Sequence, residues 1–192
     1  MFNLIQRQIC IPVIPTMKRL EQFLMTDLST CLLQDIHVSL LADIINTLHK
    51  HERKTLVHID MINGVSSDEY GTEYVCQKLK ADGVISSKSK IIETTKRNKK
   101  IAIQRMFLID SKSVDRGVDM LLRSKPDMVE VMPAIAYRII PYIKDRLNIP
   151  IIGGGLLKTK ADIENGLKAG CVAFTVSDLN LCKEVCKSTR TL

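Results

Sequence analysis

Long apolar runs are the first thing this sequence lacks. No stretch of its 192 residues approaches the roughly 20 consecutive apolar residues that a membrane-spanning helix needs. The first 16 residues contain no basic n-region, no long apolar h-region and no small-residue cleavage site. We therefore interpret them as containing a first strand and not a secretory leader. We expect a cytoplasmic protein with no membrane partner.

Metal-binding and disulfide motifs are missing as well. The six cysteines form no CxxC pair, and no histidine stands at ligand spacing from them, which argues against a zinc site. Cys182 and Cys186 are the nearest pair, at a spacing typical of one packed helix face. Cysteines scattered through the predicted elements of a cytoplasmic chain are usually buried, reduced thiols. We expect no metal, no cofactor and no disulfide framework.

Linkers and low-complexity tracts are also absent, so we interpret residues 1–192 as one domain. What the chain does contain is a regular alternation of β-rich apolar runs with amphipathic stretches of helical length. The predicted strands cover residues 10–16, 31–36, 55–62, 82–89, 101–110, 127–133, 150–156 and 171–178. A strand followed by a helix, repeated eight times, is the signature of parallel βαβ units. We predict an α/β fold, a compact (β/α)8 TIM-type barrel, over a doubly wound open sheet, because polar residues follow many strands and not one switch point.

The most informative stretch is PIIGGGL, over residues 150–156, where a strand runs into three glycines. The loops after the seventh and eighth strands of such a barrel commonly bind phosphate through backbone amides. Gly153, Gly154 and Gly155 would expose their amides, and Thr175 and Ser177 follow on the eighth strand. The pattern predicts a phosphate site between these two strand ends, although a simple turn remains an alternative.

Four charged residues at other strand ends would hold the rest of a small phosphorylated molecule. Asp60 and Glu130 can accept hydrogen bonds from hydroxyls, and Lys88 and Arg105 can balance them or reach the phosphate. Arg105 has a second interpretation as a structural partner of Glu130, since buried charges must be paired. We place His58 on the opposite face of its strand, under a helix. The sequence shows no recognisable pair of a nucleophile and a general base, so the interpretations as a ligand sensor and as an enzyme both remain open.

Several of these stretches resemble one known family. HIDMINGVSSDE (58–69), DGVISSKSKII (82–92), IQRMFLIDS (103–111), DMVEVMPA (127–134) and IIGGGLLKTKADIENGLKAG (151–170) are similar to the glycerol uptake operon antiterminator regulatory proteins. The resemblance runs nearly end to end. It implies a non-enzymatic barrel that binds glycerol 3-phosphate and then binds the leader mRNA of glycerol-utilisation genes, which allows transcription through a terminator and so regulates glycerol metabolism. The phosphate and glycerol positions would be those given above.

The RNA-binding surface implied by that resemblance has one candidate, the basic run formed by Lys96, Arg97, Lys99 and Lys100. This run is either a solvated helix end or a patch that contacts phosphates. Tryptophan is absent and aromatic residues make up 4% of the chain, so base stacking cannot be the main mode of binding. The alternative function is a small phosphate-binding enzyme acting on a glycerol phosphate, as a phosphodiesterase, lyase or prenyltransferase. A homo-oligomer is possible in either case.

Overall fold

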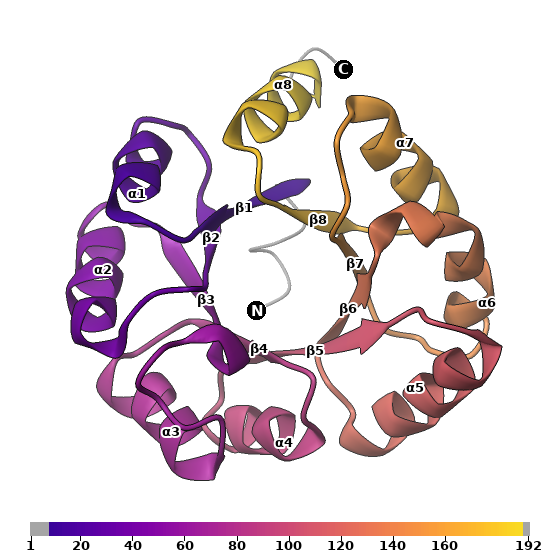
Figure 1. Ribbon diagram of the computed structural model, residues 1–192, viewed down its shortest axis with the longest axis horizontal. Helices are drawn as coiled ribbons and strands as arrows, with labels where there is room; N and C mark the ends of the chain where they lie inside the picture. The colour runs from indigo at the N-terminus through magenta and orange to yellow at the C-terminus, as the bar shows by residue number, and fades with distance from the viewer. Residues whose placement is uncertain (1–7, 190–192) are drawn as a thin grey trace.

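Eight short runs of aliphatic and β-branched residues form the strands of a closed barrel in the computed structural model, which describes residues 8–189 (Figure 1). The strands are β1 (Cys10–Ile14), β2 (Thr30–Leu33), β3 (Lys54–His58), β4 (Gly83–Ser86), β5 (Ile101–Phe107), β6 (Met128–Met132), β7 (Ile151–Gly154) and β8 (Ala173–Val176). Each pairs in parallel with the next, and β8 pairs with β1 through Phe174 and Cys10. The closure confirms the predicted barrel and excludes the open sheet.

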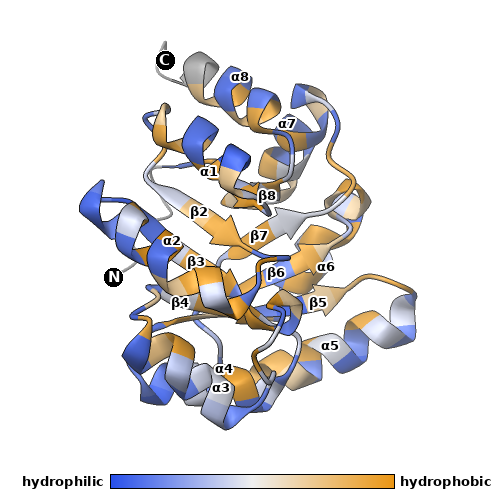
Figure 2. Ribbon diagram, turned by 60° about the vertical axis from the view of Figure 1, so that its left-hand side comes forward, coloured by the Kyte–Doolittle hydropathy of each residue, from blue (hydrophilic) through white to orange (hydrophobic). Residues whose placement is uncertain are grey.

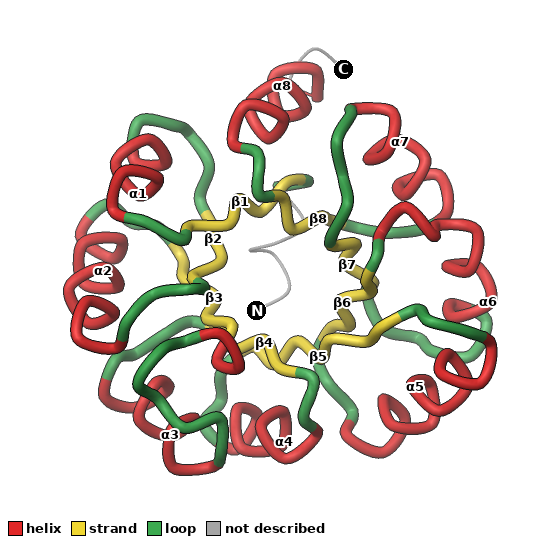
Figure 3. Tube along the Cα trace, in the orientation of Figure 1, coloured by secondary structure: helices red, strands yellow, loops and turns green. Residues whose placement is uncertain are grey.

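Helices connect the strands and form an outer ring around them (Figure 3). They are α1 (Met17–Leu24), α2 (Val38–Lys50), α3 (Glu69–Glu73), α4 (Ser89–Arg97), α5 (Ser111–Ser124), α6 (Ile140–Lys144), α7 (Lys160–Ala169) and α8 (Leu179–Thr189). A π-helical segment over Tyr74–Lys78 continues α3, and 3-10 helices cover Ile59–Met61 and Ala134–Ile139. Because parallel strands need such crossovers, each helix starts near the carboxyl end of one strand and returns toward the start of the next.

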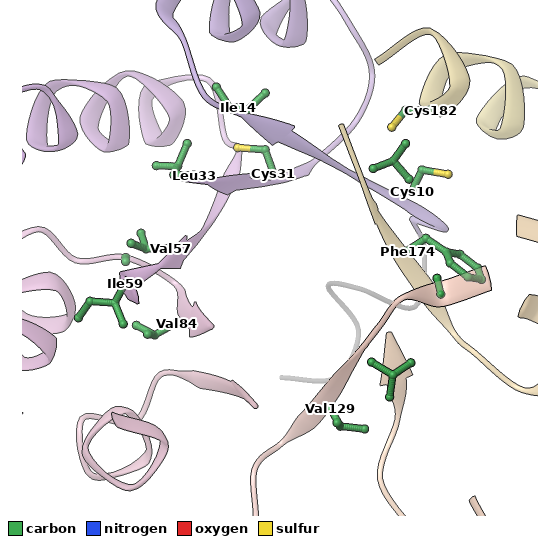
Figure 4. Close-up of a cluster of buried hydrophobic side chains, with 14 of the residues drawn as sticks. Cys10, Ile14, Cys31, Leu33, Val57, Ile59, Val84, Val129, Phe174 and Cys182 are labelled. Atoms are coloured by element: carbon green, nitrogen blue, oxygen red, sulfur yellow. The ribbon is translucent and has the colours of Figure 1, made fainter. Parts of the chain in front are cut away.

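The strands are buried on both of their faces, which explains why their sequences are continuous apolar runs. Side chains that point into the barrel form one cluster, which includes Leu56, Ile103 and Ile152. Side chains that point outward pack under the helices in a second cluster, where Cys10, Phe174 and Cys182 lie (Figure 4). The hydropathy colouring shows the same division, with apolar strands inside and polar residues on the outer helix surfaces (Figure 2).

The observed strands end earlier than the sequence predicts. The run predicted over 55–62 leaves the sheet after His58 and turns through the short helix Ile59–Met61. The run predicted over 150–156 leaves it after Gly154, because Gly155 has a φ of +78°. Apolar residues continue past both of these strand ends, so composition alone does not mark where the backbone turns into the mouth of the barrel.

Candidate functional site

The carboxyl ends of the strands form the mouth of the barrel, and the strand register decides which side chains line it. Inward-facing residues of a staggered barrel stack in layers of four, each drawn from alternate strands. Followed strand by strand, the pairings place Val13, His58, Arg105 and Gly154 in the layer at the floor of the mouth. The layer beneath it contains Leu32, Ile85, Glu130 and Thr175. Polar side chains therefore occupy the upper part of an interior that is apolar farther down.

A buried ion pair spans these two layers. Nε of Arg105 donates to Oε2 of Glu130 at 2.6 Å, and the hydroxyl of Thr175 donates to Oε1 at 2.6 Å. Glu130 is completely buried and Arg105 is 8% exposed. A buried carboxylate needs such compensation, because removing it from water is costly. The structure thus brings three of the predicted site residues together, and Arg105 is the partner of Glu130.

Each of the three glycines at the end of β7 is explained by a different structural constraint. A Cβ at position 153 would lie 2.7 Å from the ring of Phe174, and one at position 154 would lie 2.6 Å from Oγ1 of Thr175 and 2.9 Å from Oε1 of Glu130. Gly155 has a φ of +78°, a conformation that side chains other than glycine rarely adopt. The glycine run therefore keeps room for the buried ion pair and lets the chain turn out of the barrel.

Asp60 ties the end of β3 to the end of β4. Its carboxylate accepts hydrogen bonds from the hydroxyls of Ser67 and Ser86 and from the amide of Ser87, the last at 3.0 Å. Burial by itself would raise the pKa of Asp60, but these hydrogen bonds outweigh it and lower the pKa below its ordinary value. Asp60 is thus an ionised carboxylate, held by three donors at the rim of the mouth.

Lys88 belongs to the same corner of the mouth. It is exposed, it precedes α4, and its Nζ donates to the carbonyl oxygen of Ser67 at 2.9 Å. Its amide donates to the hydroxyl of Ser86. The contact with Ser67 joins the loop after β3 to the start of α4, next to Asp60.

The prediction that His58 points away from the mouth is wrong. Side chains along a strand alternate with a period of two, so His58 shares the inward face with Leu56 and not the outward face with Val57. It is 2% exposed, pairs in register with Ile85, and lies in the floor layer with Arg105. Neither of its ring nitrogens has a hydrogen-bond partner in the described part of the chain.

A pocket of about 470 Å³ lies between the loops that follow β7 and β8. It is lined by Gly155 to Lys158 from the first loop, by Thr175 to Asp178 from the end of β8 and the loop after it, and by Arg19 from α1. Arg19 and Lys158 supply positive charge, whereas Asp178 carries negative charge and accepts from the amide of Asn180 at 2.8 Å. The sequence reasoning missed both cations because it considered strand ends, and Arg19 lies inside the first helix.

The basic run lies at the other end of the barrel. α4 ends at Arg97 and β5 begins at Ile101, so the intervening residues sit at the amino ends of the strands, opposite the mouth. Nζ of Lys96 donates to the carbonyl oxygen of Lys125 and lies 3.7 Å from Asp127, and Arg97 pairs with Glu69 at 2.8 Å. Lys99 is exposed and Lys100 is half-buried.

Two further properties concern the whole described chain. Within residues 8–189, no helix is both long and apolar enough to cross a membrane. In the same range, no three His, Cys, Asp or Glu side chains are grouped so that they could hold a metal ion.

Fold and site together define a (β/α)8 barrel with a buried ion pair under its mouth and a partly cationic pocket between the ends of β7 and β8. Residues 10–182 match the family described as glycerol-3-phosphate responsive antiterminators. The chain belongs to this family, as its sequence stretches predicted.

Solved structures agree with that assignment. The chain is similar to the glycerol uptake operon antiterminator regulatory protein of Listeria monocytogenes, with 32% identity, a TM-score of 0.88, and 91% of this chain and 94% of that chain covered. An antiterminator-related protein of Thermotoga maritima is 25% identical, with a TM-score of 0.81 and coverage of 92% and 98%. The uncharacterized protein YgcP of Escherichia coli is 24% identical over 142 residues, which is 74% of each chain.

Proposed function

We propose that this protein is a glycerol 3-phosphate sensor that acts in the cytoplasm as a transcription antiterminator by binding the leader mRNA of glycerol-utilisation genes. The observation that carries the proposal is the family match over residues 10–182, on a barrel whose mouth has the polar groups that a small phosphorylated polyol requires. The family's own description supplies the ligand class.

The phosphate is assigned to the pocket between the ends of β7 and β8. Gly155 lines this pocket without a side chain, Gly153 and Gly154 precede it at the end of β7, and Ser177 offers an exposed hydroxyl. Arg19 of α1 and Lys158 of the loop after β7 add positive charge. Charge-assisted hydrogen bonds of this type are among the strongest that a protein makes to an anion. Thr175 would support the pocket through its bond to Glu130 more than by direct contact.

The glycerol end is assigned to the floor and the rim of the mouth. Nε of the Arg105 guanidinium bonds to Glu130, and we assign its terminal nitrogens to the glycerol hydroxyls. Asp60 and Lys88 flank the opening at the ends of β3 and β4. Hydroxyl groups suit such a surface because each can both donate and accept a hydrogen bond.

A regulatory protein fits this mouth better than an enzyme, because its carboxylates already have partners. Glu130 accepts from Arg105 and Thr175, and Asp60 accepts from Ser67, Ser86 and Ser87. A general base must approach the proton that it removes, whereas both carboxylates are held in place by bonds to other parts of the barrel. Incubation with glycerophosphodiesters, or with a prenyl diphosphate and Mg²⁺, tests the alternative. Turnover above ~1 per second, the lower edge of typical enzyme rates, would refute a purely regulatory role.

Leader mRNA would contact the end of the barrel opposite the ligand, where Lys99 and Lys100 project beyond α4. Lys96 and Arg97 belong to the same run, but their side chains already bond to Lys125 and Glu69 and are less available to RNA. Contacts of this kind neutralise phosphates and depend strongly on salt. In this arrangement the ligand site and the RNA site occupy opposite ends of one barrel.

Thermal unfolding with and without glycerol 3-phosphate tests the ligand half of the proposal. A ligand at 100 times its Kd stabilises the native state by ~2.7 kcal/mol. For a domain of this size that corresponds to a rise in the midpoint of roughly 5–10 °C. Glycerol and inorganic phosphate are the controls. A rise with another phosphorylated metabolite but none with glycerol 3-phosphate would contradict the proposal and favour the enzyme.

A further inference from the structure

His58 is a buried polar group that the fold does not satisfy. Its side chain is 2% exposed, it lies in the floor layer of the mouth, and both of its ring nitrogens lack a hydrogen-bond partner among residues 8–189. Buried side-chain nitrogens and oxygens nearly always have a partner, so each exception calls for an explanation.

The acceptors nearest in the fold are already engaged by other groups. Glu130, in the layer beneath, accepts from Arg105 and Thr175. Asp60, two residues after His58, accepts from two serine hydroxyls and one amide. Neither carboxylate bonds to the imidazole in this network of contacts among the described residues.

The charge of the floor indicates what kind of group His58 could bind. Arg105 is neutralised by Glu130, and burial, with a further contribution from Arg105, lowers the pKa of His58 to about 4. The imidazole is thus neutral at pH 7, and the floor as a whole carries no net charge. A neutral imidazole presents one donor and one acceptor. An uncharged hydroxyl matches this pair, whereas an anion fits the cationic wall formed by Arg19 and Lys158.

We propose that His58 hydrogen-bonds a hydroxyl group of the ligand at the floor of the mouth, beside Arg105. This contact selects a phosphorylated polyol over a phosphate ester that lacks hydroxyls. The assignment rests on the proposed function. The phosphate would sit higher, between the ends of β7 and β8. Gly154 shares the floor layer with His58 and directly precedes Gly155, which lines the pocket between the ends of β7 and β8.

The test compares glycerol 3-phosphate with propyl phosphate by titration calorimetry, for the wild type, His58→Phe, and the exposed control His51→Phe. The wild type and the control should bind glycerol 3-phosphate about tenfold or more tightly than propyl phosphate, since a lost hydrogen bond in a buried site has an effect of that size. His58→Phe should weaken this preference several-fold while its affinity for propyl phosphate stays the same, because Arg105, Asp60 and Lys88 keep their contacts with the hydroxyls. His58→Asn, which keeps a donor and an acceptor, should restore part of it.

Three outcomes separate the possible failures. If the wild type binds neither ester, the proposed function and this assignment fall together. If the wild type binds glycerol 3-phosphate and a folded His58→Phe binds it within twofold, His58 has no role in the ligand site and only this assignment is refuted. If His58→Phe does not fold, the ring nitrogens of wild-type His58 are followed by ¹⁵N NMR. Glycerol 3-phosphate should shift them and propyl phosphate should not, and equal shifts would overturn the assignment.

Discussion

Replacing Glu130 with glutamine should destabilise the protein by about 3 kcal/mol. Glutamine has the shape of glutamate and can still accept from Nε of Arg105, but it removes the negative charge from a site that is completely buried. Breaking a buried ion pair by removing one partner typically costs 3–5 kcal/mol, because the remaining charge has no compensation. The retained hydrogen bond places the expected cost at the lower end. The oxygen that now accepts from Thr175 is also replaced by a donor.

Urea unfolding followed by circular dichroism measures this cost, and a thermal scan should show the midpoint falling by about 9 °C for a domain of this size. The double variant Arg105→Met, Glu130→Leu is the matched control, because apolar residues of similar volume often replace a buried ion pair at little cost. It should therefore be more stable than Glu130→Gln alone. A cost below about 1 kcal/mol for Glu130→Gln, or a double variant less stable than the single one, would refute the view that Arg105 is a buried charge dependent on Glu130.

Three further predictions follow from other parts of the site. Gly154→Ala should cost ~2 kcal/mol, as overpacking does, because its Cβ would meet the hydroxyl of Thr175; urea unfolding measures this, and a neutral effect would contradict the close packing. Lowering the pH from 6.5 to 4 should reduce the unfolding free energy of the wild type by up to about 3 kcal/mol more than that of His58→Phe. The reason is that His58 takes up a proton in the unfolded chain but not in the native protein. Parallel plots of unfolding free energy against pH for the two proteins would contradict burial of a neutral imidazole. Changing Lys99 and Lys100 to glutamine should lower the salt slope of leader mRNA binding by about two, and an unchanged slope would move the RNA surface elsewhere.

The fold could be predicted from local sequence because its determinants are repeated and local. Eight apolar runs alternate with amphipathic stretches, and a parallel sheet covered by helices is the arrangement that buries both. The runs over 55–62 and 150–156 mark β3 and β7 correctly. Their ends were predicted too late, because the turns depend on the positive φ of Gly155 and on a short helix after His58.

The site was predicted less completely, since sequence position does not show which hydrogen bonds and ion pairs each polar group makes. Strand-end position brought Arg105, Glu130 and Thr175 into one group, and the structure joins them. It did not indicate that Asp60 is held by three donors, nor that Arg19 of α1 reaches the pocket between β7 and β8. Those contacts join residues that are far apart in the chain.

His58 shows where the division between sequence and tertiary structure lies. The sequence by itself determined the period of the elements, their number and the family, because these depend on local composition and on motifs that persist in order along the chain. The closed register of the barrel decided which face of β3 points inward and which neighbours each buried charge meets. Hydrogen bonds inside the mouth join different strands, and only closure of the sheet brings those strands around one centre. The free imidazole at the floor of the mouth is a consequence of that closure.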